Sequence, residues 1–159
     1  MSRVQLALRV ADLEGSIAFY SKLFGAEPAK LRPGYANFAI TEPPLKLVLI
    51  EGEEGEPTRM DHLGVEVEDT AQVTAAAQRL TEAGLATFEE NDTTCCYALQ
   101  DKVWVHGPGN EPWEVYVVKA DAGTLAKQTG STCCATPETT NDTTAAAGQD
   151  EQAQKSACC

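Results

Sequence analysis

Two eight-residue segments of this chain match position by position. They are residues 5–12, Gln-Leu-Ala-Leu-Arg-Val-Ala-Asp, and residues 62–69, His-Leu-Gly-Val-Glu-Val-Glu-Asp. Each alternates in the manner of a strand with one buried face and ends in an aspartate that can cap a helix. An internal repeat of this kind constrains the fold more than any other feature, because it predicts two modules with one strand-then-helix plan.

Apolar stripes with helical spacing follow both octets. The first ends at Gly25 and the second near Gly84, as helices that stop at glycine do. Strand-like runs follow at residues 29–31, 35–40 and 46–50, and in the second unit at residues 86–90, 96–100, 103–106 and 114–118. The pattern predicts an α+β fold in which two paired βαβββ modules form a cupped mixed sheet. The closing strands also align, with Lys46 at the position of Glu114.

The composition changes sharply near residue 121. From there to residue 159 the chain consists mainly of Thr, Ala, Gln, Asp and Glu, with no aromatic residue. Such a segment buries too little apolar surface to offset its ordering entropy. The sequence therefore predicts a domain at residues 1–120, with modules of about 1–56 and 57–120, followed by a disordered acidic tail at residues 121–159.

Charge and cysteine content restrict the function. A formal charge of -12 argues against a nucleic-acid partner and leaves no basic stripe for an anionic membrane. Residues 1–10 show no signal peptide or membrane span, so we expect a cytoplasmic protein. In a reducing cytosol, the six cysteines are expected to be ligands, nucleophiles or redox groups rather than structural crosslinks.

Three side chains are candidates for a metal site. Strand alternation places Gln5 and His62, at matching positions of the repeat, on the cupped face, and Glu114 faces the same way as Tyr116 on the last strand. An amide oxygen, an imidazole and a carboxylate could hold an ion with positions left open. The simpler alternatives are a hydrogen-bonded structural histidine and a cleft amide. The repeat favours the metal interpretation, because it relates the positions on a common surface.

Cysteine doublets occur three times, and only Cys95-Cys96 lies in a segment predicted to fold. Adjacent thiols can chelate a soft, thiophilic element, although a regular strand would point them to opposite faces. Residues 91–94, Asn-Asp-Thr-Thr, look like a turn, which predicts a loop where both sulfurs face one atom. Alternatively, one cysteine packs as a small apolar residue. Lys102 could neutralise a bound thiolate or orient an intermediate, or it is a solvated surface lysine.

Three segments together resemble the vicinal oxygen chelate superfamily, which has the glyoxalase and extradiol dioxygenase fold. They are residues 13–25, with Leu-Glu-x-Ser-Ile-x-Phe-Tyr-x-Lys-Leu-Phe-Gly, residues 62–65, and residues 107–116, with Gly-Pro-Gly-Asn-Glu-Pro-Trp-Glu-Val-Tyr. The resemblance covers residues 1–119. Within the superfamily, the doublet before the third strand of the second module resembles the organoarsenical carbon–arsenic lyases and the related cadmium-induced proteins.

This resemblance implies that ferrous iron, Fe(2+), is held by Gln5, His62 and Glu114, and that Cys95 and Cys96 bind a trivalent organoarsenical. Gln5 stands where the superfamily commonly has histidine, and an amide oxygen is a weaker donor. The implied activity is dioxygen-dependent cleavage of the carbon–arsenic bond of methylarsenite or trivalent aromatic arsenicals, releasing arsenite. The tail pairs could relay arsenicals by thiol exchange, or form a dispensable or protective tail; they are Cys133, Cys134, Cys158 and Cys159.

Two other functions remain open at this point. A thiol-based arsenical or cadmium binding protein needs the cysteines but not the triad. A glyoxalase-type isomerase needs a carboxylate base, and Lys46 in place of a fourth acidic ligand argues against it. A triad drawn from one chain makes a self-contained site the more economical arrangement, while monomer and homodimer both remain possible.

Overall fold

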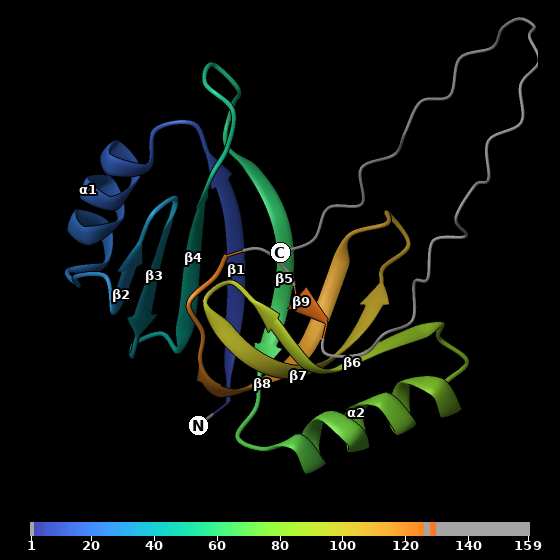
Figure 1. Ribbon diagram of the computed structural model, residues 1–159. Coiled ribbons are helices and arrows are strands. Elements are labelled where there is room, and N and C mark those ends of the chain that lie inside the picture. Colours follow the sequence, from blue (N-terminus) through green and yellow to red (C-terminus); the bar gives the residue numbers. More distant parts are fainter. Residues whose placement is uncertain (1, 126–127, 130–159) are drawn as a thin grey trace, which may run out of the picture.

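Two copies of one βαβββ module account for most of the chain that the structure describes (Figure 1). The computed structural model describes residues 2–125 and 128–129. The first module contains β1 (Arg3–Val10), α1 (Leu13–Phe24), β2 (Lys30–Arg32), β3 (Tyr35–Ile40) and β4 (Leu45–Glu51). The second contains β5 (Arg59–Glu66), α2 (Thr70–Glu82), β6 (Thr87–Cys95), β7 (Ala98–His106) and β8 (Pro112–Asp121), and β9 (Gln128–Thr129) follows. The two predicted modules are confirmed.

The strands form one curled mixed sheet in the order β2-β3-β4-β1-β5-β8-β7-β6-β9. Strands β1 and β5 pair antiparallel and join the modules, while β4 runs parallel to β1 and β8 runs parallel to β5. Helix α1 covers the outside of the first module and α2 the outside of the second (Figure 1). The concave face is thereby left for a site, so the predicted α+β class and cupped sheet are confirmed.

Both helices begin as the sequence predicts. The Asp12 carboxylate accepts a hydrogen bond from the Gly15 backbone N–H at 2.8 Å, and the Asp69 carboxylate accepts one from that of Gln72 at 2.8 Å. Helix α1 ends at Gly25 in the left-handed conformation, with φ of 61°. Caps of this kind satisfy N–H groups that the first turn leaves without partners.

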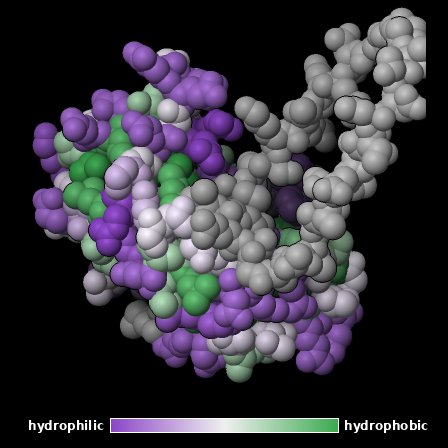
Figure 2. Space-filling model, viewed as in Figure 1, coloured by the Kyte–Doolittle hydropathy of each residue, from purple (hydrophilic) through white to green (hydrophobic). Residues whose placement is uncertain are grey.

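The helices differ in how deeply they pack. Helix α2 buries Val73, Ala76 and Ala77, whereas α1 buries no residue completely. The inner stripe of α1 packs on the strand residues Val10, Phe38 and Leu47, among others. Its outer face keeps Phe19 58% exposed, and green apolar residues gather among purple ones over the first module (Figure 2).

The second module differs from its predicted strand pattern. Residues 91–94, predicted as a turn, belong to β6, and the runs at 96–100 and 103–106 are replaced by the single strand β7. The pairing of β6 with β7 shifts register between Glu90 and Thr93, and Asp92 adopts a φ of 52° there. The turn-forming Asn-Asp pair therefore builds a β-bulge inside a strand instead of a loop.

The register also corrects the predicted match between Lys46 and Glu114. Ala7 pairs with Val48 on β4, and Gly64 pairs with Glu114 on β8. Because Ala7 and Gly64 match in the repeat, Val48 is the counterpart of Glu114. The sequence alignment was wrong by two residues, since it matched a proline before β4 with the first residue of β8. A shift of two keeps Lys46 on the concave face.

The described chain continues past β8 along the turn that carries the cysteine doublet. The Tyr97 carbonyl accepts a hydrogen bond from the Ala122 N–H at 2.9 Å, and the Leu125 carbonyl accepts one from the Cys96 N–H at 3.2 Å. The predicted disordered tail begins at residue 121, and its described residues carry these hydrogen bonds and strand β9; the four tail cysteines and the rest of that segment lie outside the described residues. Over the part that the structure describes, neither helix has the length and apolar character needed to cross a bilayer.

Candidate active site in the cup of the sheet

Gln5, His62 and Glu114 lie side by side on the adjacent strands β1, β5 and β8. Gln5 Nε2 is 2.9 Å from His62 Nε2 and 2.9 Å from Glu114 Oε1, and His62 Nε2 is 3.4 Å from Glu114 Oε1. All three residues are at most 4% exposed. The structure therefore brings together the three side chains that the sequence singled out.

Gly64 leaves the space in which the three side chains converge. A Cβ built at this position would lie 3.2 Å from Glu114 Cγ, 3.2 Å from Tyr116 Cε1 and 3.3 Å from Gln5 Cβ. These distances are shorter than comfortable packing allows. The glycine of the repeat thus has a specific role, which is to let β1 and β8 side chains meet over β5.

This donor set fits a divalent metal ion. Two donors about 2.1 Å from an ion and at right angles around it are about 3 Å apart, close to the measured separations. Within residues 2–125, no group of three His, Cys, Asp or Glu side chains is arranged to hold a metal ion, so the Gln5 amide is the candidate for a third donor beside His62 and Glu114. A half-turn of that amide exchanges Nε2 and Oε1, and the Tyr116 hydroxyl, now donating to Oε1 at 2.5 Å, can then accept from Nε2.

Asp61 orients the histidine. Its Oδ1 lies 2.7 Å from His62 Nδ1, and its Oδ2 accepts a hydrogen bond from Arg9 Nε at 2.5 Å. A carboxylate on one ring nitrogen directs the other toward the candidate ion. Burial lowers the pKa of His62, but the hydrogen bonds to Asp61 and Glu114 outweigh it and raise the pKa to about 9. Asp61 was not among the predicted site residues, although it directly precedes His62 in the sequence.

Lys102 is buried, which corrects the interpretation as a solvated lysine. It is 3% exposed, and its Nζ donates to Glu114 Oε2 at 2.7 Å. Burial alone would raise the pKa of Glu114, but the Lys102 and His62 charges and hydrogen bonds lower it to about 2. Burial likewise lowers the Lys102 pKa, and the charges of Glu114 and of the Cys95 and Cys96 thiolates outweigh it and raise the pKa. Glu114 is therefore a carboxylate at neutral pH.

The cysteine doublet occupies a tight turn between β6 and β7. Cys95 is the last residue of β6 and pairs with Ala98, while Cys96 and Tyr97 have φ values of 53° and 60°. Two successive positive φ angles are typical of a type I′ hairpin turn. The turn is shorter than the predicted loop, but it has the same effect on the two sulfurs. In a regular strand the side chains of Cys95 and Cys96 would point to opposite faces, and Cys96 lies outside that geometry.

The two sulfurs are placed for chelation. Cys95 Sγ and Cys96 Sγ are 3.4 Å apart. This exceeds the disulfide length of about 2.05 Å. It is close to the separation of about 3.3 Å expected for two sulfurs at right angles around one soft centre about 2.3 Å from each. The arrangement can hold one thiophilic atom without moving the backbone.

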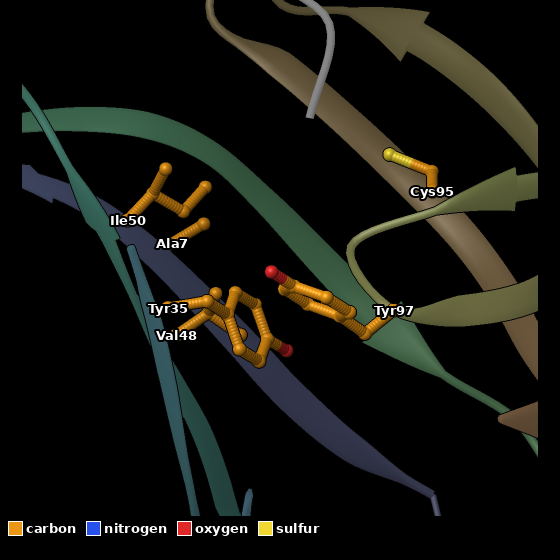
Figure 3. Close-up of a cluster of buried hydrophobic side chains, with 6 residues drawn as sticks. All are labelled: Ala7, Tyr35, Val48, Ile50, Cys95 and Tyr97. Atoms are coloured by element: carbon orange, nitrogen blue, oxygen red, sulfur yellow. The ribbon is translucent and has the colours of Figure 1, made fainter. Parts of the chain in front are cut away.

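Cys95 and Cys96 have different surroundings. Cys95 is 3% exposed and packs with Ala7, Tyr35, Val48, Ile50 and Tyr97, the cluster drawn in Figure 3. Tyr97 reaches back from the turn toward Tyr35, with ring centroids 5.5 Å apart, and its hydroxyl donates to the Pro33 carbonyl at 3.0 Å. The apolar packing that the sequence offered as an alternative is thus seen at Cys95, whereas Cys96 is only partly buried.

A cavity of about 220 Å³ connects Cys96 of the doublet with the triad. Its lining includes Gln5, His62, Glu114, Lys102 and Cys96. A ligand held by the sulfurs therefore shares one space with the candidate metal ligands. Lys46 and Asn37 line the same cavity from the first module, and neither of them was among the predicted site residues.

Comparison with known proteins agrees with this architecture. The family model described as Glyoxalase/Bleomycin resistance protein/Dioxygenase superfamily matches residues 3–115. An extradiol ring-cleaving dioxygenase from B. fuscum aligns with a TM-score of 0.56 at 21% identity, over 76% of this chain and 34% of that one. A likeness at this identity concerns the fold.

Two relatives of known name are much closer in sequence. A protein of Thermomonospora curvata named trivalent organoarsenical cleaving enzyme is 73% identical over 94% of this chain and 99% of its own length. The cadmium-induced protein CadI of Mycobacterium tuberculosis is 64% identical over 79% of this chain and 82% of its own length.

Proposed function

The chain belongs to the Glyoxalase/Bleomycin resistance protein/Dioxygenase superfamily, and from this premise we propose that it is an enzyme that cleaves the carbon–arsenic bond of trivalent organoarsenicals. Fe(II) is the proposed cofactor, dioxygen the co-substrate and arsenite the product. Support comes from the 73% identical relative whose name states this substrate class, and from the cavity that Cys96 and the triad share.

Capture of the substrate begins at the sulfurs. An arsenical with two hydroxyl groups exchanges both for the Cys95 and Cys96 thiols, forming two sulfur–arsenic bonds and releasing two water molecules. The spacing of 3.4 Å between the sulfurs supports a chelate of this kind. The organic group stays on arsenic and projects into the cavity, because the chelate occupies the other two positions of the trivalent atom.

Oxidation then removes the organic group. Methylarsenite and dioxygen together contain the same atoms as arsenite and formaldehyde. In this reaction the carbon–arsenic bond breaks and the carbon is oxidised to an aldehyde. Dioxygen takes up the four electrons that the carbon loses. One oxygen atom appears on carbon and one on arsenic, and two water molecules then replace the two thiols on arsenic and release arsenite. Fe(II), when bound, supplies a centre that binds and reduces dioxygen.

The residues around the triad have separate tasks in this proposal. Gln5, His62 and Glu114 would hold the iron, and Asp61 fixes the imidazole through the 2.7 Å hydrogen bond at Nδ1. Lys102 keeps Glu114 ionised through the hydrogen bond that its ammonium donates at 2.7 Å. The walls position the organic group next to the reacting centre, so that an oriented encounter replaces a bimolecular one. All three proposed metal ligands come from one chain, which supports a self-contained site.

The observation that carries the proposal is the position of Cys96 in the cavity of the triad. The test is to load purified protein with Fe(II), add methylarsenite with and without dioxygen, and measure arsenite and formaldehyde. We expect both products in equal amounts, in air only. Absence of arsenite in air would overturn the proposal, and arsenite formed equally without dioxygen would overturn the oxidative reaction.

Sequestration of arsenicals or cadmium is the second candidate, because the sulfur spacing needs only the doublet. The relative named for cadmium induction motivates it. His62→Ala separates the two functions. Under the enzyme proposal this variant binds phenylarsenite but forms no arsenite, and cells that express it lose resistance to methylarsenite. Equal resistance from the variant and the wild type would favour sequestration.

A further inference from the structure

Lys46 presents a buried ammonium group to the cavity without a hydrogen-bond acceptor. The residue is 8% exposed and lines the same space as the triad and Cys96. Within residues 2–125, the nearest carboxylate oxygen to its Nζ is Glu66 Oε2 at 3.8 Å, which is beyond hydrogen-bond distance. A buried cation with three donors and no acceptor is costly unless a ligand or water completes it.

The surrounding charges do not remove this need. Arg3 Nε donates to the same Glu66 Oε2 at 2.6 Å, so the carboxylate is already engaged. The Tyr116 ring also lies near Lys46, with its centroid 5.0 Å from Nζ. A cation over a ring is stabilised, but its N–H groups remain available.

Other cations of the cavity have acceptors. Lys102 donates to Glu114 at 2.7 Å, and Lys30 donates to the Tyr97 carbonyl at 3.2 Å and to the Asp121 carboxylate. Among the lysines that line the cavity, Lys46 is therefore the one whose ammonium group has no hydrogen-bond acceptor within residues 2–125. This is notable in a chain with a formal charge of -12, because the cup gathers cations while the protein as a whole is acidic.

Space for a ligand lies beside Lys46. Its register partner on β3 is Ala39, a small residue that also lines the cavity, and the next cup-facing residue of β3 is Asn37. The Asn37 amide donates to the Tyr35 hydroxyl at 3.0 Å and is 9% exposed. A cavity of about 150 Å³ is enough for benzene in another protein. The 220 Å³ found here accommodates a benzene ring with a small substituent.

We propose that Lys46 is a specificity-determining residue that binds an anionic oxygen group, such as a carboxylate, carried by the organic part of the arsenical. The inference rests on the proposed function, because it requires arsenic to be held at the doublet. Arsenic at Cys96 marks one point of the cavity and the Lys46 ammonium another, so an aromatic arsenical with an acidic substituent can occupy both. Methylarsenite, which has no such group, gains nothing from Lys46.

The test measures binding in the absence of turnover. Fe(II)-loaded protein is titrated without dioxygen with phenylarsenous acid and with para-carboxyphenylarsenous acid, against competing glutathione. The variants are Lys46→Met, Lys46→Arg and, as a matched control for the loss of one exposed lysine, Lys22→Met. The intrinsic difference in thiol affinity between the two arsenicals cancels when the ratio of their dissociation constants is compared among variants.

We expect the wild type to favour the carboxylated arsenical and Lys46→Met to reduce that preference by about 10- to 100-fold, the usual worth of a hydrogen bond to a charged group. Lys46→Arg and Lys22→Met should retain it. If Lys46→Met lowers the thermal midpoint, Lys46→Gln serves as a second uncharged variant. An unchanged ratio in the uncharged variants, or no preference in the wild type, overturns the inference.

Failure of the inference is distinguishable from failure of the proposed function. The binding ratio is measured without dioxygen and does not depend on turnover. Arsenite formation from methylarsenite in air tests the enzyme proposal separately. If the preference for the carboxylated arsenical does not depend on Lys46 while arsenite forms normally, only the role of Lys46 is rejected. If the preference depends on Lys46 but no arsenite forms, only the enzyme proposal is rejected. In the last arm, free benzoate is added together with phenylarsenous acid. If phenylarsenous acid then binds as tightly as the carboxylated arsenical, the carboxylate need not belong to the arsenical.

Discussion

Gly64 on β5 pairs with Glu114 on β8, and a Cβ at position 64 would lie 3.2 Å from Glu114 Cγ. The closest contacts that it would make all involve residues of the candidate metal site or their neighbours. The absence of a side chain at one position of the repeat therefore has a direct effect on the geometry of the triad.

Gly64→Ala should weaken metal binding more than it weakens the fold. The added methyl group has to displace Glu114, Tyr116 or Gln5 by a few tenths of an ångström, and metal ligands tolerate little displacement. We expect Fe(II) affinity to fall about tenfold or more, with a loss of unfolding free energy within the usual range of about 1–3 kcal/mol for overpacking. Metal titration and urea unfolding of the metal-free protein measure the two effects. Equal metal affinity in variant and wild type contradicts the role assigned to Gly64.

Asp61→Asn should reduce metal affinity without removing a ligand. The carboxylate holds His62 Nδ1 at 2.7 Å, and partners of this kind are worth about 10- to 100-fold in metal affinity. The measurement is competition for Fe(II) against a chelator of known affinity. Glu56→Gln, which alters an exposed acidic residue outside the cup, is the matched control and should leave the affinity unchanged. Loss of affinity in both variants would indicate a general effect of charge.

Cys96→Ser should remove arsenical chelation and leave metal binding in place. A single remaining thiolate at Cys95 forms one sulfur–arsenic bond instead of two, so we expect phenylarsenite affinity to fall about 100-fold or more, as for the loss of one arm of a bivalent contact. Fe(II) affinity should stay within about threefold of the wild type, because neither sulfur belongs to the triad. Arsenical titration against glutathione gives the first value and Fe(II) competition the second. A variant that binds phenylarsenite as the wild type does would remove the chelate from the proposal.

The sequence could predict the triad because two regularities coincide. The repeat places Gln5 and His62 at one position of two modules, and the strand period of two places Glu114 on the same face of β8. Both regularities are visible in short stretches of sequence and do not depend on how the loops fold. The modules, helix caps and concave face follow from the same signals.

Other parts of the site depend on contacts that local patterns do not contain. From its sequence neighbours alone, Lys102 is predicted to be an exposed lysine. In the fold it bonds to Glu114, which lies twelve positions further on and on the neighbouring strand β8. Residues 91–94 read as a turn because Asn and Asp favour turns, but the Asp92 N–H finds its acceptor on Asp101 of the neighbouring strand. In both cases pairing between strands overrides the preference of the individual residue.

Asp101→Asn should lower stability and weaken its dependence on acid pH. Asp101 is 3% exposed, accepts hydrogen bonds from the Asp92 N–H at 2.8 Å and from the Thr70 hydroxyl at 2.6 Å, and receives a third from Lys119. It thereby ties the bulge of β6 to the start of α2 and to β8. Replacing one acceptor oxygen with an NH₂ group leaves a buried donor facing other donors, which costs about 1–3 kcal/mol of unfolding free energy.

The pH dependence follows from the direction of the pKa shift. Burial raises the pKa of Asp101, but the hydrogen bonds from the Asp92 backbone, Thr70 and Lys119 outweigh it, so the pKa in the folded protein lies below its usual value of 3.8. A group with a lowered folded pKa stabilises the protein above its unfolded pKa, and this stabilisation is lost as the pH falls through the folded value. The wild type should therefore lose stability on acidification below pH 3.8 more steeply than Asp101→Asn, which has no carboxyl group at this position to titrate. Urea unfolding at about pH 7 and about pH 3 measures the loss of stability in both proteins. Parallel curves for Asp101→Asn and the wild type would mean that the stabilising hydrogen bonds of Asp101 do not depend on its charge.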